Sequence, residues 1–141
     1  MKSLLAWLSL FTLLSGCATS PDEMHCGTVS GYLEPDRSQG LYRAVVTHLD
    51  GTPVISRPNY QLPPGKYEFT LAELIDSETL EVKLAARKTK VLVIQVEAGQ
   101  QYHFAAKFNQ DKIYRGLETD YWQPVIWQQA FHECELAPQL P

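Results

Sequence analysis

Residues 89–108 read TKVLVIQVEAGQQYHFAAKF, and this stretch decides the fold class. Residues 89–97 are almost all apolar and rich in β-branched side chains, which is typical of a strand in the centre of a sheet. Ala98-Gly99-Gln100 predicts a turn, and residues 101–108 then alternate in polarity as a half-buried strand does. The stretch therefore predicts a β-hairpin.

The chain before this hairpin carries a second hairpin signal. Residues 41–49 (LYRAVVTHL) are rich in side chains that favour strands, and Asp50-Gly51 follows them. Both turn residues tolerate a positive φ, so the pair is a strong signal for a two-residue hairpin loop. Residues 52–56 are the candidate return strand, which Pro53 restricts to an edge or an end because proline has no N–H to donate.

A further strand is predicted after the Pro64-Gly65 pair. Proline presets its own φ, and we expect Gly65 to adopt a positive φ, which together give the pattern of a type II turn. Residues 66–72 (KYEFTLA) then alternate in polarity, which indicates a half-buried antiparallel strand. The side chains expected on its inner face are those of Tyr67, Phe69 and Leu71.

Residues 72–85 (AELIDSETLEVKLA) carry a mixed signal. Asp76 or Ser77 is suited to cap a short helix with glutamates in its first turns. The same stretch is compatible with another strand. We expect a loop here, followed by a strand near residues 80–85.

The C-terminal part predicts a polar loop and one last strand. Residues 109–119 are polar, and residues 121–134 are rich in aromatic side chains and favour a strand interrupted at Pro124. With the segments above, this makes about seven strands separated by glycine and proline turns. The expected fold is all-β, an antiparallel β-sandwich.

Composition and charge exclude one class of function. The chain has 141 residues, of which 45% are hydrophobic and 20% charged, so it is long enough for one folded domain. The formal net charge is −4. A nucleic-acid-binding protein needs a basic patch or stripe, so we expect no nucleic-acid partner.

The first residues look like an export signal. Lys2 provides a positive charge, and residues 4–14 (LLAWLSLFTLL) form an apolar run. Eleven residues are too few to span a bilayer as a helix, which takes about 20, but they suit the apolar region of a secretory signal. Leu14-Ser15-Gly16-Cys17 follows the run and precedes a polar stretch.

Leu14-Ser15-Gly16-Cys17 resembles the lipobox of bacterial lipoproteins. The resemblance implies that Cys17 receives a diacylglyceryl group, that the chain is cut before it, and that its new amine receives an acyl chain such as palmitate. Leu14, Ser15 and Gly16 are then recognition positions. Residue 18 is Ala rather than the Asp that favours inner-membrane retention in enterobacterial lipoproteins. The family rule thus implies a protein anchored to the outer membrane, on its periplasmic face.

This interpretation divides the chain into four parts. Residues 1–16 are the expected signal peptide, and residues 17–25 are the lipidated N-terminus and tether. Residues 26–135 are the expected β-sandwich domain, and residues 136–141 are a C-terminal tail.

Two cysteines remain if Cys17 carries lipid, namely Cys26 and Cys134. An even number of cysteines in an oxidising compartment favours a disulfide between them. His25 and His132 lie near the two cysteines, so a zinc or copper site made of His25, Cys26, His132 and Cys134 is an alternative. Free thiols are a third outcome.

Three segments also resemble small bacterial envelope lipoproteins with a transthyretin-like or PEGA-like domain. These segments are Asp50-Gly51, residues 62–69 (LPPGKYEF) and residues 98–102 (AGQQY). The resemblance implies a β-sandwich and a location in the cell envelope. It implies no activity, because a fold alone does not define a function.

Known catalytic motifs are absent from the sequence. It contains no G-x-S-x-G, H-E-x-x-H or S-x-x-K motif and no glycine-rich phosphate loop, so we expect no enzymatic activity and no cofactor. A hydrolase remains an alternative if the fold places His48 or His103 beside a carboxylate. The acidic residues that cluster between positions 73 and 81 are interpreted as a solvated face. They are Glu73, Asp76, Glu78 and Glu81.

The aromatic side chains near the C-terminus are the strongest candidates for a binding surface. Tyr121, Trp122, Trp127 and Phe131 lie within one segment, and exposed rings are frequent anchors for a protein or glycan partner. We select Tyr121, Trp122 and Trp127 as candidate binding residues, with burial in the core as the alternative. The expected function is that of a non-enzymatic, membrane-tethered module that binds an envelope protein or cell-wall glycan, and the alternative is metal handling.

Overall fold

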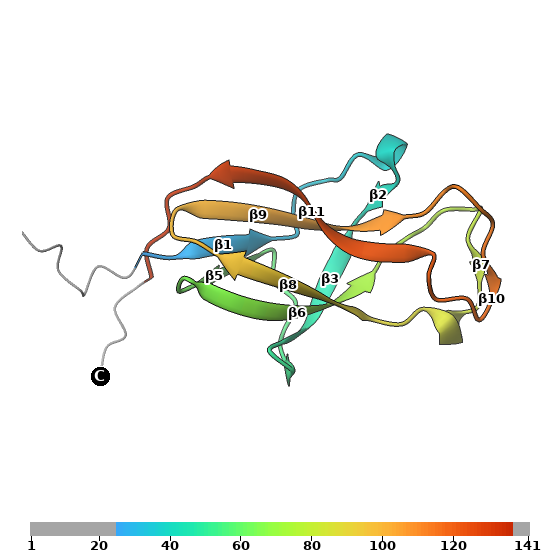
Figure 1. The fold of residues 1–141 in the computed structure, drawn as a ribbon, viewed down its shortest axis with the longest axis horizontal. Coiled ribbons are helices and arrows are strands. Elements are labelled where there is room, and N and C mark those ends of the chain that lie inside the picture. Colours follow the sequence, from blue (N-terminus) through green and yellow to red (C-terminus); the bar gives the residue numbers. More distant parts are fainter. Residues whose placement is uncertain (1–24, 137–141) are drawn as a thin grey trace, which may run out of the picture.

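The computed structural model describes residues 25–136, which fold into the expected all-β sandwich of two packed sheets (Figure 1). The first sheet has the strand order β11-β9-β1-β5, with β2 also paired to β9. The second sheet has the order β4-β3-β6-β8. The first sheet consists of β1 (Gly27–Ser30), β2 (Leu41–Tyr42), β5 (Asn59–Leu62), β9 (Gln100–Phe108) and β11 (Trp122–Phe131). The second consists of β3 (Ala44–Leu49), β4 (Thr52–Pro53), β6 (Gly65–Glu73) and β8 (Lys90–Val96).

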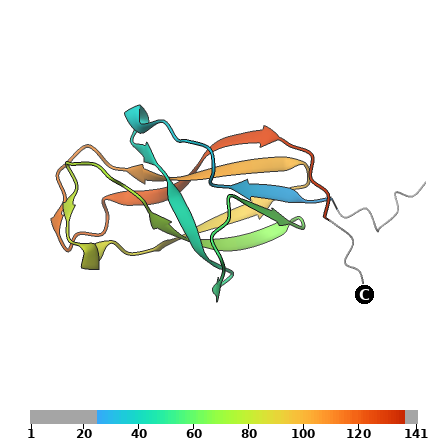
Figure 2. The same ribbon diagram turned by 180° about the vertical axis from the view of Figure 1, so that it is seen from behind.

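The remaining elements are short. A two-stranded sheet joins β7 (Glu81–Val82) to β10 (Arg115–Gly116), at the end of the molecule opposite residues 25 and 136 (Figures 1 and 2). Two 3-10 turns complete the fold, η1 (Arg37–Gln39) and η2 (Leu84–Ala86). Among residues 25–136, no helix has the length and hydrophobicity needed to cross a membrane.

The sandwich differs from the expected one in containing parallel pairs. β1 runs parallel to β9 and antiparallel to β5, and β7 runs parallel to β10. β1 begins beside the turn that leads into β9, since Gly99 donates its N–H to the Cys26 carbonyl at 3.0 Å. Both strands therefore start at the same end of the sheet and run in the same direction.

The core lies between the two sheets and takes large side chains from both. The first sheet contributes Val29, Tyr60, Tyr102, Phe104, Phe108 and Trp122, and the second contributes Val46, Phe69, Leu71, Ile94 and Val96. The rings of Tyr60 and Phe69 meet edge to face across the interface, with 5.9 Å between their centroids. Burial of these apolar side chains is the main force that holds the two layers together.

The Asp50-Gly51 hairpin is confirmed, but the strand before it is divided. Asp50 and Gly51 have φ values of 49° and 79°, and the turn joins β3 to β4 as expected. Leu41 and Tyr42 pair with β9 in the first sheet, whereas residues 44–49 pair with β6 in the second. The chain thus changes sheets at Arg43, which the uninterrupted run of strand-forming residues does not reveal.

The turn at Gly99 is confirmed, whereas the hairpin predicted around it is wrong. Gly99 has a φ of 74°. However, β8 pairs with β6 in the second sheet, while β9 pairs with β1, β2 and β11 in the first. The turn therefore connects the two layers. β8 is an edge strand rather than a central one. Val91 and Val93 alternate with the buried Ile94 and Val96, so they lie on the opposite face of the strand and are exposed despite their apolar character.

The prediction of a positive φ at Gly65 is also wrong. Gly65 is the first residue of β6, lies opposite Val96 in the ladder, and is not among the residues with positive φ. The inner face predicted for this strand holds, with Phe69 and Leu71 fully buried. The ambiguous stretch that follows is a loop, a two-residue strand and the 3-10 turn η2, so the strand expected near residues 80–85 is present only at Glu81–Val82.

The last strand is continuous at Pro124, where an interruption was expected. Pro124 lies opposite Ala106 in the β11–β9 ladder, and β11 is the edge of the first sheet. An edge strand has a neighbouring strand on one side only, so half of its backbone N–H groups face solvent. Proline, which has no N–H group, is tolerated at such a position. The register shifts instead between Ile126 and Gln128, which places a β-bulge at Trp127.

Neighbouring residues of β8 test this two-layer arrangement. Ile94 is 4% exposed and Val93 is 46% exposed. Ile94→Ala is expected to lower the free energy of unfolding by about 2–5 kcal/mol, because it opens a cavity in the core. Val93→Ala, the control, should change it by less than about 0.5 kcal/mol. Urea unfolding of both variants checks this, and equal losses would contradict the placement of Ile94 in the core between the two sheets and of Val93 on the opposite face of β8.

Candidate functional site

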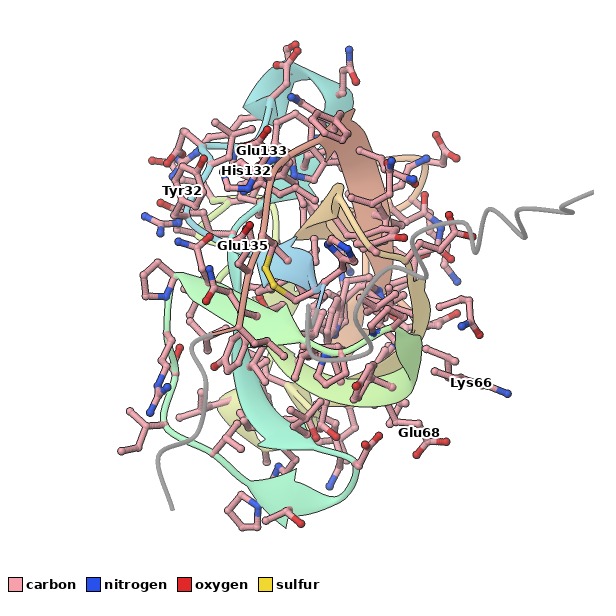
Figure 3. All side chains as sticks on the ribbon, turned by 90° about the vertical axis from the view of Figure 1, so that its left-hand side faces the viewer. Tyr32, Lys66, Glu68, His132, Glu133 and Glu135 are labelled. Carbon is pink, nitrogen blue, oxygen red and sulfur yellow. A yellow bond between two sulfur atoms is a disulfide. The ribbon has the colours of Figure 1, made fainter. Side chains whose placement is uncertain are left out.

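The predicted disulfide is present and joins the two ends of the domain. Cys26 and Cys134 are bonded to each other, are both buried, and have Cα atoms 5.2 Å apart. Cys26 also donates its N–H to the Cys134 carbonyl at 3.3 Å, and His25 pairs with Glu135 in an antiparallel bridge. Figure 3 views this end of the molecule, with the disulfide beside Glu135.

The disulfide argues against the metal site that was the alternative. Both sulfur atoms are bonded to each other, so neither is present as the thiolate that a metal would require. Within residues 25–136, no group of three or more His, Cys, Asp or Glu side chains is placed to hold a metal ion.

The expected lipidation residue, Cys17, lies outside the described residues. The same is true of residues 1–16, of the tether up to residue 24, and of residues 137–141. His25 and Leu136 are the first and last residues described, and both lie at the disulfide-bonded end (Figure 1).

Tyr121 is a core residue and does not present its ring to a partner. It is fully buried and donates its hydroxyl to Oε1 of Glu73 at 2.9 Å. The other oxygen of Glu73 accepts the N–H of Ile75 at 2.6 Å, and Nη1 of Arg87 lies 3.6 Å from Oε1. Burial raises the pKa of Tyr121, and the hydrogen bond to Glu73 and its negative charge raise this pKa further.

The prediction that the acidic residues between positions 73 and 81 form a solvated face is therefore wrong for Glu73. Its side chain is almost wholly buried, because Tyr121, Ile75 and Arg87 supply the donors that its oxygens lose from water. Asp76 and Glu81 are exposed, as expected, and pair with Arg37 and Arg115 at 3.1 Å.

Trp122 is also buried, and only Trp127 of the three candidate binding residues reaches the surface. Trp122 is 2% exposed, and Lys90 donates from Nζ to its carbonyl at 2.6 Å. Trp127 is partly buried and packs against His103, with 6.3 Å between the ring centroids. The most exposed ring of the segment belongs to Phe131.

The two histidines considered for a hydrolase have other neighbours. His103 is buried between the rings of Tyr32 and Trp127, and burial lowers its pKa, with a smaller contribution from the charge of His132. His48 lies on β3 with its Nδ1 2.8 Å from the hydroxyl of Thr47. Neither imidazole pairs with a carboxylate in the part of the chain that the structure describes.

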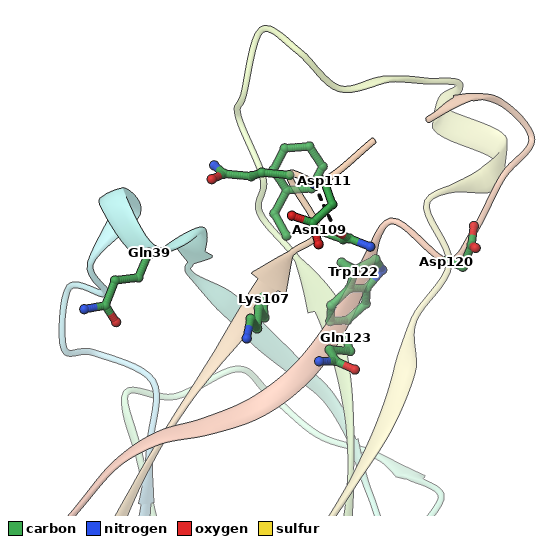
Figure 4. A pocket seen from close by; sticks show the side chains of 9 residues that line it. Gln39, Lys107, Asn109, Asp111, Asp120, Trp122 and Gln123 are labelled. Carbon is green, nitrogen blue, oxygen red and sulfur yellow. Dashed lines mark hydrogen bonds between the residues drawn. The ribbon is translucent and has the colours of Figure 1, made fainter. Parts of the chain in front are cut away.

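A polar pocket lies where β9 ends and β11 begins, and sequence reasoning missed it (Figure 4). Its volume is about 430 Å³, within the range of about 300–1,000 Å³ that is usual for small-molecule sites. The polar side chains that line it are Gln39, Lys107, Asn109, Gln110, Asp111, Asp120 and Gln123. They come from η1, from β9 and β11, and from the segment between these two strands, so no single sequence motif predicts the pocket.

No family model, curated protein or solved structure matches this chain. The similarity to transthyretin-like or PEGA-like domains therefore rests on the three short segments quoted above. The candidate sites are defined by their own geometry: the disulfide-bonded end, the Glu73–Tyr121 pair and the pocket beside Trp122.

Removal of the disulfide is expected to destabilise the domain. Cys26→Ser combined with Cys134→Ser should lower the free energy of unfolding by about 4–5 kcal/mol, because a closed loop of about 100 residues no longer restricts the unfolded chain. Denaturation in urea with and without a reductant measures this. The reductant should destabilise the natural chain and leave the double variant unchanged, and no effect on either would contradict the bridge.

The raised pKa of Tyr121 predicts a loss of stability in alkali. Above about pH 10 the unfolded chain releases the phenol proton of Tyr121, whereas the folded chain still keeps it. The contribution of Tyr121 to the free energy of unfolding is therefore complete below about pH 10 and is lost as the pH rises further. Tyr121→Phe should therefore show a smaller loss of stability from about pH 9 to about pH 11. At neutral pH the variant should be about 1–3 kcal/mol less stable, because a Glu73 oxygen loses its donor.

The control for this variant is Tyr32→Phe, which alters a half-exposed tyrosine. Urea denaturation at each pH gives the comparison. If Tyr121→Phe and the natural chain lose equal stability in alkali, the role assigned to the Glu73–Tyr121 pair is refuted.

Proposed function

We propose that this protein is a non-enzymatic envelope lipoprotein, a β-sandwich module fastened to the outer membrane through lipid on Cys17 and facing the periplasm. The observation that carries the proposal is the order of features at the N-terminus: Lys2, an apolar run, and Leu14-Ser15-Gly16-Cys17. Each buried CH₂ contributes about 0.8 kcal/mol to membrane binding, so two or three acyl chains anchor a protein stably.

The position of the domain ends supports a membrane-proximal orientation. Eight residue steps separate Cys17 from His25, so even a fully extended tether reaches only about 26–29 Å. His25 and the disulfide lie at one end of the sandwich, while β7 and β10 lie at the other (Figures 1 and 2). With lipid on Cys17, the disulfide-bonded end therefore lies no farther than about 26–29 Å from the bilayer surface, which makes it the membrane-proximal end.

The disulfide supports the proposed compartment. Disulfides persist in oxidising compartments such as the bacterial periplasm and are rare in the cytosol. The bridge between Cys26 and Cys134 leaves Cys17 as the third cysteine of the chain, which matches its proposed role as the lipid carrier.

Phase partitioning tests the anchor. The natural protein, expressed in a Gram-negative host, is expected in the detergent phase of a Triton X-114 extract. Cys17→Ser removes the sulfur that carries the lipid, so the variant should move to the aqueous phase. Equal partitioning of the two forms would overturn the proposal.

Ala18→Asp tests the sorting step and is a matched control for lipidation. This variant keeps Cys17 and should still enter the detergent phase. By the rule for residue 18, however, it should shift from outer-membrane to inner-membrane fractions in a sucrose gradient. An unchanged distribution would show that the rule does not place this protein in the outer membrane.

A further inference from the structure

A second groove lies between β5, which is one edge of the first sheet, and the β3–β4 hairpin at one edge of the second sheet. Residues 54–58 connect the hairpin to β5 on this side of the molecule (Figure 2). The volume of the groove is about 720 Å³. Its aliphatic lining consists of Leu49, Val54, Ile55, Leu62 and Leu136. The groove therefore offers an apolar surface beside an edge strand.

The edge of β5 that borders this groove is unpaired. All four residues of β5 line the groove, and the strand pairs with β1 only. In an antiparallel pair, every second residue directs its N–H and C=O away from the partner strand. Within residues 25–136, no other backbone group bonds to these outward groups of β5. Such an edge can take up an extended segment as an additional strand.

The opposite edge of the first sheet is protected against such pairing. β11 contains Pro124, which has no N–H to donate, and the bulge at Trp127, which interrupts the ladder. Residues 59–62 of β5 contain no proline, and their register with β1 is continuous. An added strand therefore fits β5 better than β11.

The lining of the groove indicates the chemistry of its occupant. Leu136 lies against the groove although it belongs to no strand, so an aliphatic side chain fits there. Ile55 is 78% exposed, which leaves most of its surface available to a partner. Arg57 is the only charged residue among the described residues that line the groove. It is exposed and makes no ion pair with any of them, so its guanidinium is free to bind a carboxylate.

We propose that this groove binds an extended segment of another protein. The segment adds a strand to β5, places aliphatic side chains in the groove and pairs a carboxylate with Arg57. Four residues of a strand span about 13 Å, so a segment of about six residues covers the site. A fatty acid also has an aliphatic chain and a carboxylate, but it leaves the edge of β5 unpaired. The compartment of the partner, the cell envelope, rests on the proposed function, whereas the groove itself does not.

Nuclear magnetic resonance titration of the detergent-purified full chain tests this site with two acetylated hexapeptide amides, TVTLTD and its reverse, DTLTVT. In both peptides the aliphatic and acidic side chains share one face, and together they cover both strand directions. One of them should shift the backbone amide signals of β5 and leave those of β8 and β11 unchanged. N-methylation of alternate residues removes the donors of one edge of the peptide. Methylation of one edge should weaken binding at least tenfold, and methylation of the other should not.

Three variants test the side chains of the groove. Arg57→Ala should weaken binding by up to about fivefold, as expected for the loss of an exposed ion pair. Arg57→Glu should weaken it further, and exchange of the aspartate of the peptide for lysine should then restore it. Ile55→Ser should weaken binding about fivefold, because an apolar contact is lost. Leu117→Ser is the matched control, since Leu117 is 69% exposed and follows β10 at the opposite end.

Absence of shifts in β5 with both peptides, equal weakening by Leu117→Ser, or equal binding of all N-methylated peptides overturns the site. Shifts in β5 with dodecanoate alone overturn the partner class in favour of a fatty acid. If a peptide binds only after deletion of residues 137–141, the occupant is a segment of this chain. If the β5 signals shift with protein concentration alone, the occupant is a second copy. Both results overturn the proposed partner.

The titration uses purified protein and is independent of the anchor. A lipidated protein that binds neither peptide therefore refutes only this inference. An unlipidated protein that binds one of them refutes only the proposed function.

Discussion

The bond between Cys26 and Cys134 is the constraint on which the arrangement of the molecule depends. It joins the residue before β1 to a residue three positions after β11, which are the first and last strands of the sandwich. Because β1 and β11 flank β9 on opposite sides, the bond closes the first sheet across its central strand. It also brings the two ends of the described domain together, so one end of the sandwich carries His25 and Leu136, the first and last described residues, and the other carries β7, β10 and the loops around them.

The opposite end is closed by a polar cluster instead of a covalent bond. Glu73 ends β6, Tyr121 immediately precedes β11, and Arg87 lies between η2 and β8. Their contacts therefore connect the end of β6 in the second sheet, the start of β11 in the first sheet and the segment that leads into β8. A buried carboxylate is costly unless donors replace water around it, and here the phenol, a backbone amide and a guanidinium do so. The polar pocket lies at the start of the same strand, β11, and shares this fixed framework.

The parts of the fold that the sequence predicts have local causes, with one exception, the disulfide, which was predicted from the number of cysteines. The Asp50-Gly51 turn, the inner face of residues 66–72 and the pairing of Cys26 with Cys134 each follow from local backbone preference, side-chain alternation or cysteine number. The partners of strands on either side of a turn are not locally encoded. The turn Ala98-Gly99-Gln100 is compatible both with a hairpin inside one sheet and with a connection between the two sheets. The packing decides between these two, because Ile94 of β8 and Phe104 of β9 enter the same core from different sheets.

In the candidate site, too, the features that the sequence did not predict are those that depend on packing between distant residues. Tyr121 and Trp122 were chosen because large rings at a surface bind partners, but the bulge at Trp127 and the depth of the core decide which ring is exposed. The pocket gathers Gln39 and Gln123, which are 84 positions apart in the sequence, so no motif could have announced it. Glu73 resembles its acidic neighbours in sequence and differs from them only because Arg87 and Tyr121 reach it.

The orientation of the whole molecule depends on what residue 17 carries, and one mass measurement addresses this directly. Intact mass spectrometry of unreduced protein, purified from outer membranes, should give a chain that begins at Cys17, carries acyl chains, and is two hydrogens lighter than its reduced form. A chain that retains Met1, or one that begins near residue 17 with an unmodified sulfur there, would contradict the account.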